Sequence, residues 1–275
     1  MTQHIIGALD GVIVTLSDSR TTFDEGPPRD AVVKYSKYPS RSDSCQEGAL
    51  AAVVLVQGRA NFNDRDDDGT VRSGTNEREA AEIVTNFLAK RSGTYSSLQK
   101  LGDDIWQHIM EEHWYGCPSC RKELNNSKQE NEPACSYHHD TGFSLFVAGV
   151  NADEGPEPML YQRVLGRRRG GTDRIKWPYH DTMANGGRAE VALYRGYGEN
   201  PADYREGLEK YWDDLVDSFN RTAAMAPCTD GPGGTEISTV GGTIHSIIVD
   251  PKTGVTEKAE RPEIAVECGQ DGYKE

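Results

Sequence analysis

The segment that decides the fold is Thr2–Arg20, TQHIIGALDGVIVTLSDSR. Two apolar runs, His4–Ala8 and Val12–Ser17, flank an Asp-Gly pair, a dipeptide that strongly favours a two-residue hairpin turn. We therefore expect a β-hairpin that begins almost at the N-terminus and holds Thr2 at the edge of a sheet.

Thr2 has the chemistry of a nucleophile with a built-in base. Met1 is normally removed when so small a side chain follows it, and the new first residue then carries a hydroxyl and a free α-amine together. The pKa of such an amine ordinarily lies near neutrality, so the amine can accept the hydroxyl proton directly or through water. An ordinary start residue is the alternative interpretation of an isolated Thr2.

Two further charged residues favour the catalytic interpretation. Asp18 follows the second apolar run, and Lys34 comes sixteen residues later in an expected strand over Ala31–Tyr35. An inward Lys34 needs a carboxylate nearby, because a buried unpaired charge is costly. Its positive field would lower the proton affinity of the amine and stabilise an alkoxide. A structural ion pair is the alternative, with Lys37 as an equally available cation.

The pattern resembles the proteasome β-subunit branch of the N-terminal nucleophile (Ntn) hydrolases, including the bacterial Anbu-type subunits. The family's catalytic threonine, the acid of its Asp-Ser-Arg segment and its strand-borne lysine fall on Thr2, Asp18 and Lys34. FSLFVAGV at 143–150 resembles the family's central strand, and VGGTIHSIIV at 240–249 resembles its late strand. The resemblance spans most of the chain, apart from about 113–140 and 165–188.

The resemblance implies an α+β fold, a four-layer αββα sandwich of the Ntn-hydrolase type, in a single domain over 1–275 with a cysteine-rich insertion at 113–140. It implies a threonine-type peptidase or amidohydrolase that cleaves an amide, with a peptide as the favoured substrate, through an acyl-enzyme ester. It also implies self-assembly into rings or another homo-oligomer. The alternatives are a catalytically inactive proteasome-like scaffold subunit that retains Met1 and a small-molecule amidase on the same fold.

The resemblance assigns supporting roles to four more residues. Arg20 is expected to bond loop carbonyls beside the site, and Gly58 resembles the glycine whose backbone N–H stabilises the oxyanion. Glu236 and Thr239 supply an acid and a hydroxyl if the late motif slips by one residue, because a valine precedes its two glycines here. The chain departs from the family at Tyr197, which stands where the family has a supporting serine.

A second set of candidate ligands lies in the expected insertion. Cys117 and Cys120 form a Cys-x-x-Cys pair, and Cys135 and His138 form a Cys-x-x-His pair with fourteen residues between the two pairs. Three thiolates and an imidazole suit a tetrahedral structural Zn²⁺ and leave no open position for catalysis. His139 is the alternative fourth ligand. A Cys117–Cys120 disulfide or free thiols are the competing interpretations, and a cytoplasmic location disfavours the disulfide.

Composition narrows the class of protein. The chain has 44 acidic and 30 basic residues and a net charge of −14, which disfavours a nonspecific nucleic-acid binder. Hydrophobic residues make up 36% of the 275 residues, enough for a substantial core. No apolar run is long enough to span a membrane, and the N-terminus lacks the pattern of a signal peptide. We therefore expect a soluble cytoplasmic protein.

Periodicity predicts the remaining elements. Asn76 is expected to cap a helix with Glu79 reaching back, and the helix buries one apolar stripe. Two more helices are predicted at 98–109 and 201–224, and further strands at 50–56, 142–150, 158–164, 190–195, 242–250 and 259–267. Because the strands come in hairpin pairs, two helix-covered sheets account for this order better than a doubly wound sheet.

Overall fold

In the computed structural model, the described residues form two main β-sheets, two small two-stranded sheets and two α-helices. The described ranges are 3–9, 11–20, 29, 31–39, 50–58, 61–62, 78–91, 95–110, 143–150, 158–164, 171–174, 179–184, 187–193, 228–230, 236–238, 241–250 and 254–258.

The first main sheet, called Sheet I, carries the N-terminal hairpin. Its order is β10 (Tyr179–Ala184), β11 (Gly187–Leu193), β1 (Gln3–Leu9), β2 (Val12–Ser17), β14 (His245–Asp250) and β15 (Gly254–Lys258). Leu9 pairs with Val12, and Gly11 between them has a φ of 82°, a left-handed conformation that glycine adopts without steric cost. The hairpin expected from the Asp-Gly pair is confirmed.

The second main sheet, called Sheet II, is entirely antiparallel. Its order is β3 (Tyr35–Tyr38), β4 (Ala51–Gly58), β7 (Phe143–Val150), β8 (Pro158–Val164) and β9 (Gly171–Arg174). Side chains alternate across a strand, so Val53 and Leu55 enter one hydrophobic cluster while Val54 and Val56 enter the other. Burial on both faces explains why β4 is an unbroken apolar run.

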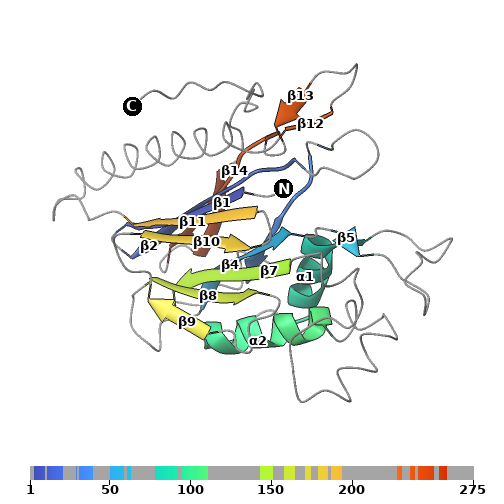
Figure 1. Ribbon diagram of the computed structural model, residues 1–275. Coiled ribbons are helices and arrows are strands. Elements are labelled where there is room, and N and C mark those ends of the chain that lie inside the picture. The colour runs from blue at the N-terminus through green and yellow to red at the C-terminus, as the bar shows by residue number, and fades with distance from the viewer. Residues whose placement is uncertain are drawn as a thin grey trace, which may run out of the picture.

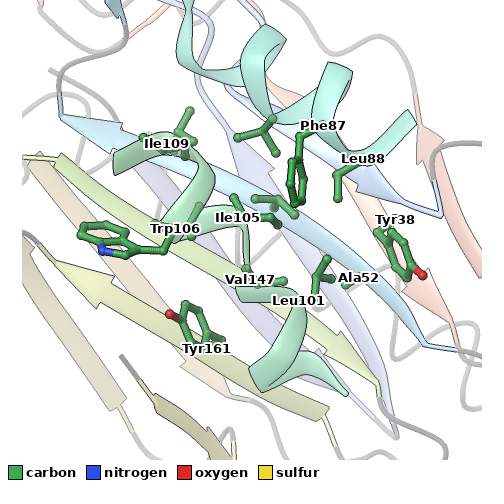
Figure 2. Close-up of a cluster of buried hydrophobic side chains, with 14 of the residues drawn as sticks. Tyr38, Ala52, Phe87, Leu88, Leu101, Ile105, Trp106, Ile109, Val147 and Tyr161 are labelled. Atoms are coloured by element: carbon green, nitrogen blue, oxygen red, sulfur yellow. The ribbon is translucent and has the colours of Figure 1, made fainter. Parts of the chain in front are cut away.

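Two apolar clusters lie between the layers of the described structure, and Figure 1 shows the sheets and helices that form these layers. The inter-sheet core lies between Sheets I and II and includes Ile6, Ile247 and Phe146. The helix-side core lies between Sheet II and the helices α1 (Ala80–Ala89) and α2 (Leu98–Ile109). In Figure 2, apolar side chains of both helices lie over those of the sheet strands. The predicted α+β class is confirmed.

Helix α1 starts later than its sequence predicted. Its N-cap residue is Glu79, whose side chain makes no capping hydrogen bond, so the Asn76 cap with Glu79 reaching back is wrong. The reason is that Arg78 and Glu79 are extended and pair, as β6 (Arg78–Glu79), with β5 (Asn61–Phe62). Helix α2 does have a side-chain cap, since Ser97 accepts a hydrogen bond from the backbone N–H of Lys100 at 3.3 Å.

Two strands lie elsewhere than predicted. Strand β3 begins at Tyr35, so the strand expected over Ala31–Tyr35 is wrong, and Lys34 immediately precedes β3. The backbone before β3 bonds outside the sheet, as the N–H of Val32 donates to the carbonyl of Ser19 at 3.0 Å. The hairpin partner of β14 is β15 at 254–258, earlier than the predicted 259–267, which lies outside the described residues. Gly254 enters β15 with a φ of 78°.

Candidate functional site

A buried ion pair joins the two sheets. The ammonium nitrogen Nζ of Lys34 lies 2.9 Å from both carboxylate oxygens of Asp18 and also donates to the backbone carbonyl of Arg20. Lys34 is 1% exposed and Asp18 is fully buried. An ammonium has three donors, and these three oxygens provide a partner for each. Since Asp18 directly follows β2 and Lys34 directly precedes β3, the pair connects the N-terminal hairpin to Sheet II.

The segment after Asp18 is fixed by a loop from the far end of the chain. The backbone carbonyl of Gly241 accepts hydrogen bonds from the N–H groups of Ser19 at 3.2 Å and Arg20 at 3.0 Å. The N–H of Thr243 donates to the hydroxyl of Ser19 at 2.8 Å. A Cβ on Gly241 would lie 2.8 Å from the Arg20 guanidinium carbon, so glycine permits this close approach. These contacts hold the Arg20 carbonyl where Lys34 uses it.

A second connection between the sheets lies next to the ion pair. The N–H of Val56 donates to the backbone carbonyl of Lys34 at 3.1 Å. On the other side, the ring nitrogen Nε2 of His4 lies 2.8 Å from the Val56 carbonyl oxygen. Strand β4 then ends at Gly58, two residues further on. The end of β4 therefore lies beside Lys34 and is tied to β1.

Polar side chains replace apolar ones at this end of the inter-sheet layer. His4, Ser17 and His245 occupy one row across β1, β2 and β14. Burial lowers the pKa of His4 to about 4, against a smaller opposing effect of its bond to Val56 and of the Asp18 charge. Burial also lowers the pKa of His245. Both imidazoles are therefore neutral at pH 7.

A separate polar cluster contains Lys37, the other lysine that was a candidate partner for Asp18. Lys37 donates to Glu257 at 3.1 Å, and the Tyr35 hydroxyl donates to the same carboxylate. Burial alone would raise the pKa of Glu257, but these two donors outweigh it and the pKa is lowered. Burial and the neighbouring Glu257 raise the pKa of Tyr35. Lys37 thus pairs with Glu257 at a half-exposed position, and the buried partner of Asp18 is Lys34.

Comparisons with known proteins find a distant structural similarity that covers most of the chain. No family model and no curated protein matches this sequence. The chain is similar in structure to an Anbu (Gly-1) mutant from Hyphomicrobium sp. strain MC1, with 13% sequence identity, a TM-score of 0.44, and coverage of 94% of this chain and 84% of the other. The resemblance noted in the sequence and this similarity agree.

The predicted site residues fall into three groups. The structure brings Asp18, Lys34 and Arg20 together, and Gly58 ends β4 two residues after Val56, whose N–H donates to the Lys34 carbonyl. Glu236 lies in β13 (Glu236–Ser238), which pairs with β12 (Cys228–Asp230) in a sheet of its own. The remaining predicted residues lie outside the described part of the chain: Thr2, Thr239, Cys117, Cys120, Cys135 and His138.

Sequence reasoning missed four contributors to the site: His4, Ser19, Gly241 and Thr243. The Gly-Gly pair at 241–242 was a signal for two of them, since it belongs to the late-strand motif. His4 had no signal, because a single histidine in an apolar run is compatible with an ordinary core position.

Within the described ranges, no group of three or more His, Cys, Asp or Glu side chains is arranged to hold a metal ion. Neither of the two described helices has the length and apolar character required to cross a bilayer.

Proposed function

We propose that this chain is an N-terminal threonine hydrolase that cleaves an amide bond, with a peptide as the favoured substrate. The observation that carries the proposal is the buried Lys34–Asp18 pair beside the start of β1. Replacing a buried ion pair by apolar residues of similar volume is often neutral or stabilising. A pair retained in the interior, with every lysine donor given a partner, is better explained by a need for a fixed positive charge.

In the proposed reaction, the hydroxyl oxygen of Thr2 attacks the amide carbon while its proton passes to the Thr2 α-amine. The oxygen of the tetrahedral intermediate carries the negative charge, and the backbone N–H of Gly58 donates to it. Lys34 acts through its field, which favours the neutral amine and the alkoxide. Asp18 keeps Lys34 charged and oriented, because both carboxylate oxygens accept from it.

The ester then forms and breaks by the same groups. The C–N bond cleaves as the protonated α-amine returns its proton to the leaving nitrogen, which gives a free amine product and a threonyl ester. Water attacks the ester carbon, the α-amine accepts the water proton, and the C–O bond to Thr2 breaks. The hydroxyl regains a proton and the acid product leaves, so the enzyme is restored without a metal or cofactor taking part in any proposed step.

The experiment that tests this proposal combines intact mass with covalent labelling. Mature protein should lack Met1, and an epoxyketone or β-lactone should add one mass equivalent per chain at Thr2. Thr2→Ala should abolish labelling and hydrolysis with an unchanged melting temperature, while Thr2→Ser, which keeps the hydroxyl, should still be labelled. Full hydrolysis by Thr2→Ala would exclude the mechanism. Retained Met1 would instead favour a catalytically inactive scaffold subunit.

A substrate panel separates the peptidase from the small-molecule amidase. We expect cleavage of fluorogenic peptides several residues long to exceed cleavage of the same fluorophore attached to a short N-acyl group. The opposite ranking would favour the amidase.

We also propose the fourth layer that the Ntn-hydrolase sandwich requires. Val12, Val14 and Leu16 alternate along β2 with the residues that face Sheet II, and they are buried too. The outer face of Sheet I is thus covered, and the amphipathic helix expected at 201–224 is the proposed cover. Its apolar stripe is Leu208, Trp212, Leu215 and Phe219.

We also propose that the chain assembles into a homo-oligomer and that it binds a structural zinc ion. Self-assembly into rings or another homo-oligomer predicts a native mass that is an integral multiple of 30.3 kDa. A structural Zn²⁺ held by Cys117, Cys120, Cys135 and His138 predicts one metal equivalent in protein purified without added zinc. A Cys117→Ser/Cys120→Ser variant should lose the metal and keep hydrolysis. A disulfide between these two cysteines would replace the zinc proposal.

A further inference from the structure

His4 connects the strand that leads to the N-terminus with the strand that leads to Gly58. It lies in β1 of Sheet I, and its Nε2 contacts the carbonyl oxygen of Val56 in β4 of Sheet II at 2.8 Å. A carbonyl oxygen only accepts hydrogen bonds, so Nε2 carries the proton and donates. Val56 is also held from its other side, because its N–H donates to the Lys34 carbonyl at 3.1 Å.

The bond lies within two residues of two groups assigned to catalysis. His4 follows Thr2 by two residues, and Val56 precedes Gly58 by two. We propose that His4 is a positioning residue, whose Nε2–H bond to Val56 fixes the N-terminal strand relative to Lys34 and to the end of β4. The inference rests on the proposed hydrolase function, since it assigns His4 a part in the geometry of that site.

His4 is suited to hold geometry and not to exchange protons. Burial lowers its pKa to about 4, and the nearest charged influences, Asp18 and Lys34, oppose one another. The ring is therefore neutral at pH 7 and its one proton is committed to Val56. Its other nitrogen, Nδ1, is buried and has no hydrogen-bond partner among the described residues. A neutral donor with a fixed tautomer keeps one bond across the pH range in which the α-amine of Thr2 works.

Three variants test the role. His4→Leu removes the donor and keeps an apolar side chain of similar size, whereas His4→Gln keeps an N–H donor at comparable reach. His245→Leu is the matched control, because His245 is a partly buried histidine in the same row but makes no hydrogen bond to β4 within the described structure. Misplacement of reacting groups by about 1 Å can cost about 100-fold in rate. We expect His4→Leu to lower kcat by about 10- to 100-fold at nearly constant KM.

The rescue and the control sharpen this expectation. His4→Gln should recover kcat to within about fivefold of wild type with the wild-type pH profile, and His245→Leu should stay within about threefold. Hydrogen exchange measured by mass spectrometry supplies a readout that needs no activity. Exchange of peptides covering 3–9 and 51–58 should rise in His4→Leu, return in His4→Gln and stay unchanged in His245→Leu.

The outcomes separate this inference from the proposed function. If the wild-type protein is active and His4→Leu keeps the wild-type kcat, the positioning role is wrong and the hydrolase proposal stands. An equal fall in kcat for His4→Leu and His4→Gln also overturns it, because the donor would not be what matters. A wild-type protein that shows neither labelling nor hydrolysis overturns the proposed function, and with it the catalytic meaning of His4, whatever the exchange data show about the bond.

Discussion

The helix-side core and the site end of the inter-sheet layer are equally buried but have opposite chemistry. Ile105, Leu101 and Val147 in the first are apolar and fully buried, and they pack between α2 and Sheet II (Figure 2). Asp18 and Lys34 in the second are as deeply buried and charged. Apolar burial stabilises a fold in proportion to area, whereas a buried charge pair gives little net stability. Apolar burial therefore accounts for the stability of the first region but not for the charges in the second.

Removing one of the two buried charges tests most directly whether the two regions have different roles. Lys34→Met keeps the length of the side chain and leaves Asp18 buried without its cation. We expect hydrolysis to fall by at least about a thousandfold, and the free energy of unfolding to fall by about 3–5 kcal/mol because an uncompensated carboxylate remains inside. Fluorogenic peptide assays and urea unfolding measure the two effects.

Two further variants separate charge from stability in the same experiment. Lys37→Met removes a lysine whose ion pair is half exposed, so it should cost at most about 1 kcal/mol and leave activity nearly intact. Lys34→Met/Asp18→Leu removes both buried charges and should regain much of the lost stability without regaining activity. Greater loss of activity in Lys37→Met than in Lys34→Met would show that the site is assigned to the wrong lysine.

The second prediction tests the apolar region. Ile105 is fully buried in the helix-side core, and Ile105→Ala should lower the free energy of unfolding by about 2–5 kcal/mol. The rate per folded molecule should stay within about threefold of wild type, because no described contact links Ile105 to the Asp18–Lys34 pair. Thermal unfolding and active-site titration measure the two quantities. A large loss of specific activity in fully folded protein would mean that the two regions are coupled.

The sequence predicted the elements whose pattern is purely local. The Asp-Gly pair between two apolar runs, the unbroken apolar run of β4 and the helical stripe ending in Ile109 each predicted the correct element. The structure departs where long-range pairing decides the backbone. Arg78–Glu79 becomes extended because β5 is available to pair with it, and β11, which pairs with β10, also pairs with β1 across most of the chain. No local pattern contains that information.

The site divides in the same way. Asp18 and Lys34 were predictable as a pair, since a lysine carried inward requires a carboxylate. The contribution of the Gly241–Thr243 loop was not, because three of its hydrogen bonds to Ser19 and Arg20 use backbone groups that every residue has. His4 was missed because a single histidine in an apolar run is compatible with an ordinary core position, and only the geometry shows that its partner is Val56.

The third prediction uses pH to compare the regions. His4 has a pKa of about 4 in the folded protein and an ordinary value of 6.5. Between these two pH values the unfolded chain binds a proton at His4 and the folded protein does not. The contribution of the neutral, buried His4 to stability is therefore complete above pH 6.5 and is lost as the pH falls toward 4. The loss amounts to about 3 kcal/mol. Urea unfolding at pH 7 and pH 4.5 should show a smaller decrease in His4→Gln than in wild type.

The comparison of the two proteins isolates His4, because the carboxylates that titrate in the same pH range are common to both. Ile105→Ala, which changes only apolar surface, should show the same decrease as wild type. An equal decrease in wild type and His4→Gln would mean that His4 is accessible to protons in the folded state.

The smallest predicted effect concerns a glycine in the helix-side core. A Cβ on Gly102 of α2 would lie 2.4 Å from the ring of Tyr161, which is itself buried and donates to Asp103 at 3.0 Å. Overpacking costs about 1–3 kcal/mol, and alanine regains about 1 kcal/mol of helix propensity, so Gly102→Ala should destabilise by up to about 2 kcal/mol. In a double-mutant cycle with Tyr161→Leu, whose side chain lacks the ring, most of this cost should disappear. Additive effects, or a Gly102→Ala protein more stable than wild type, would mean that α2 is free to move away from Sheet II, and that the helix-side core is less closely packed than the burial of Ile105 and Leu101 indicates.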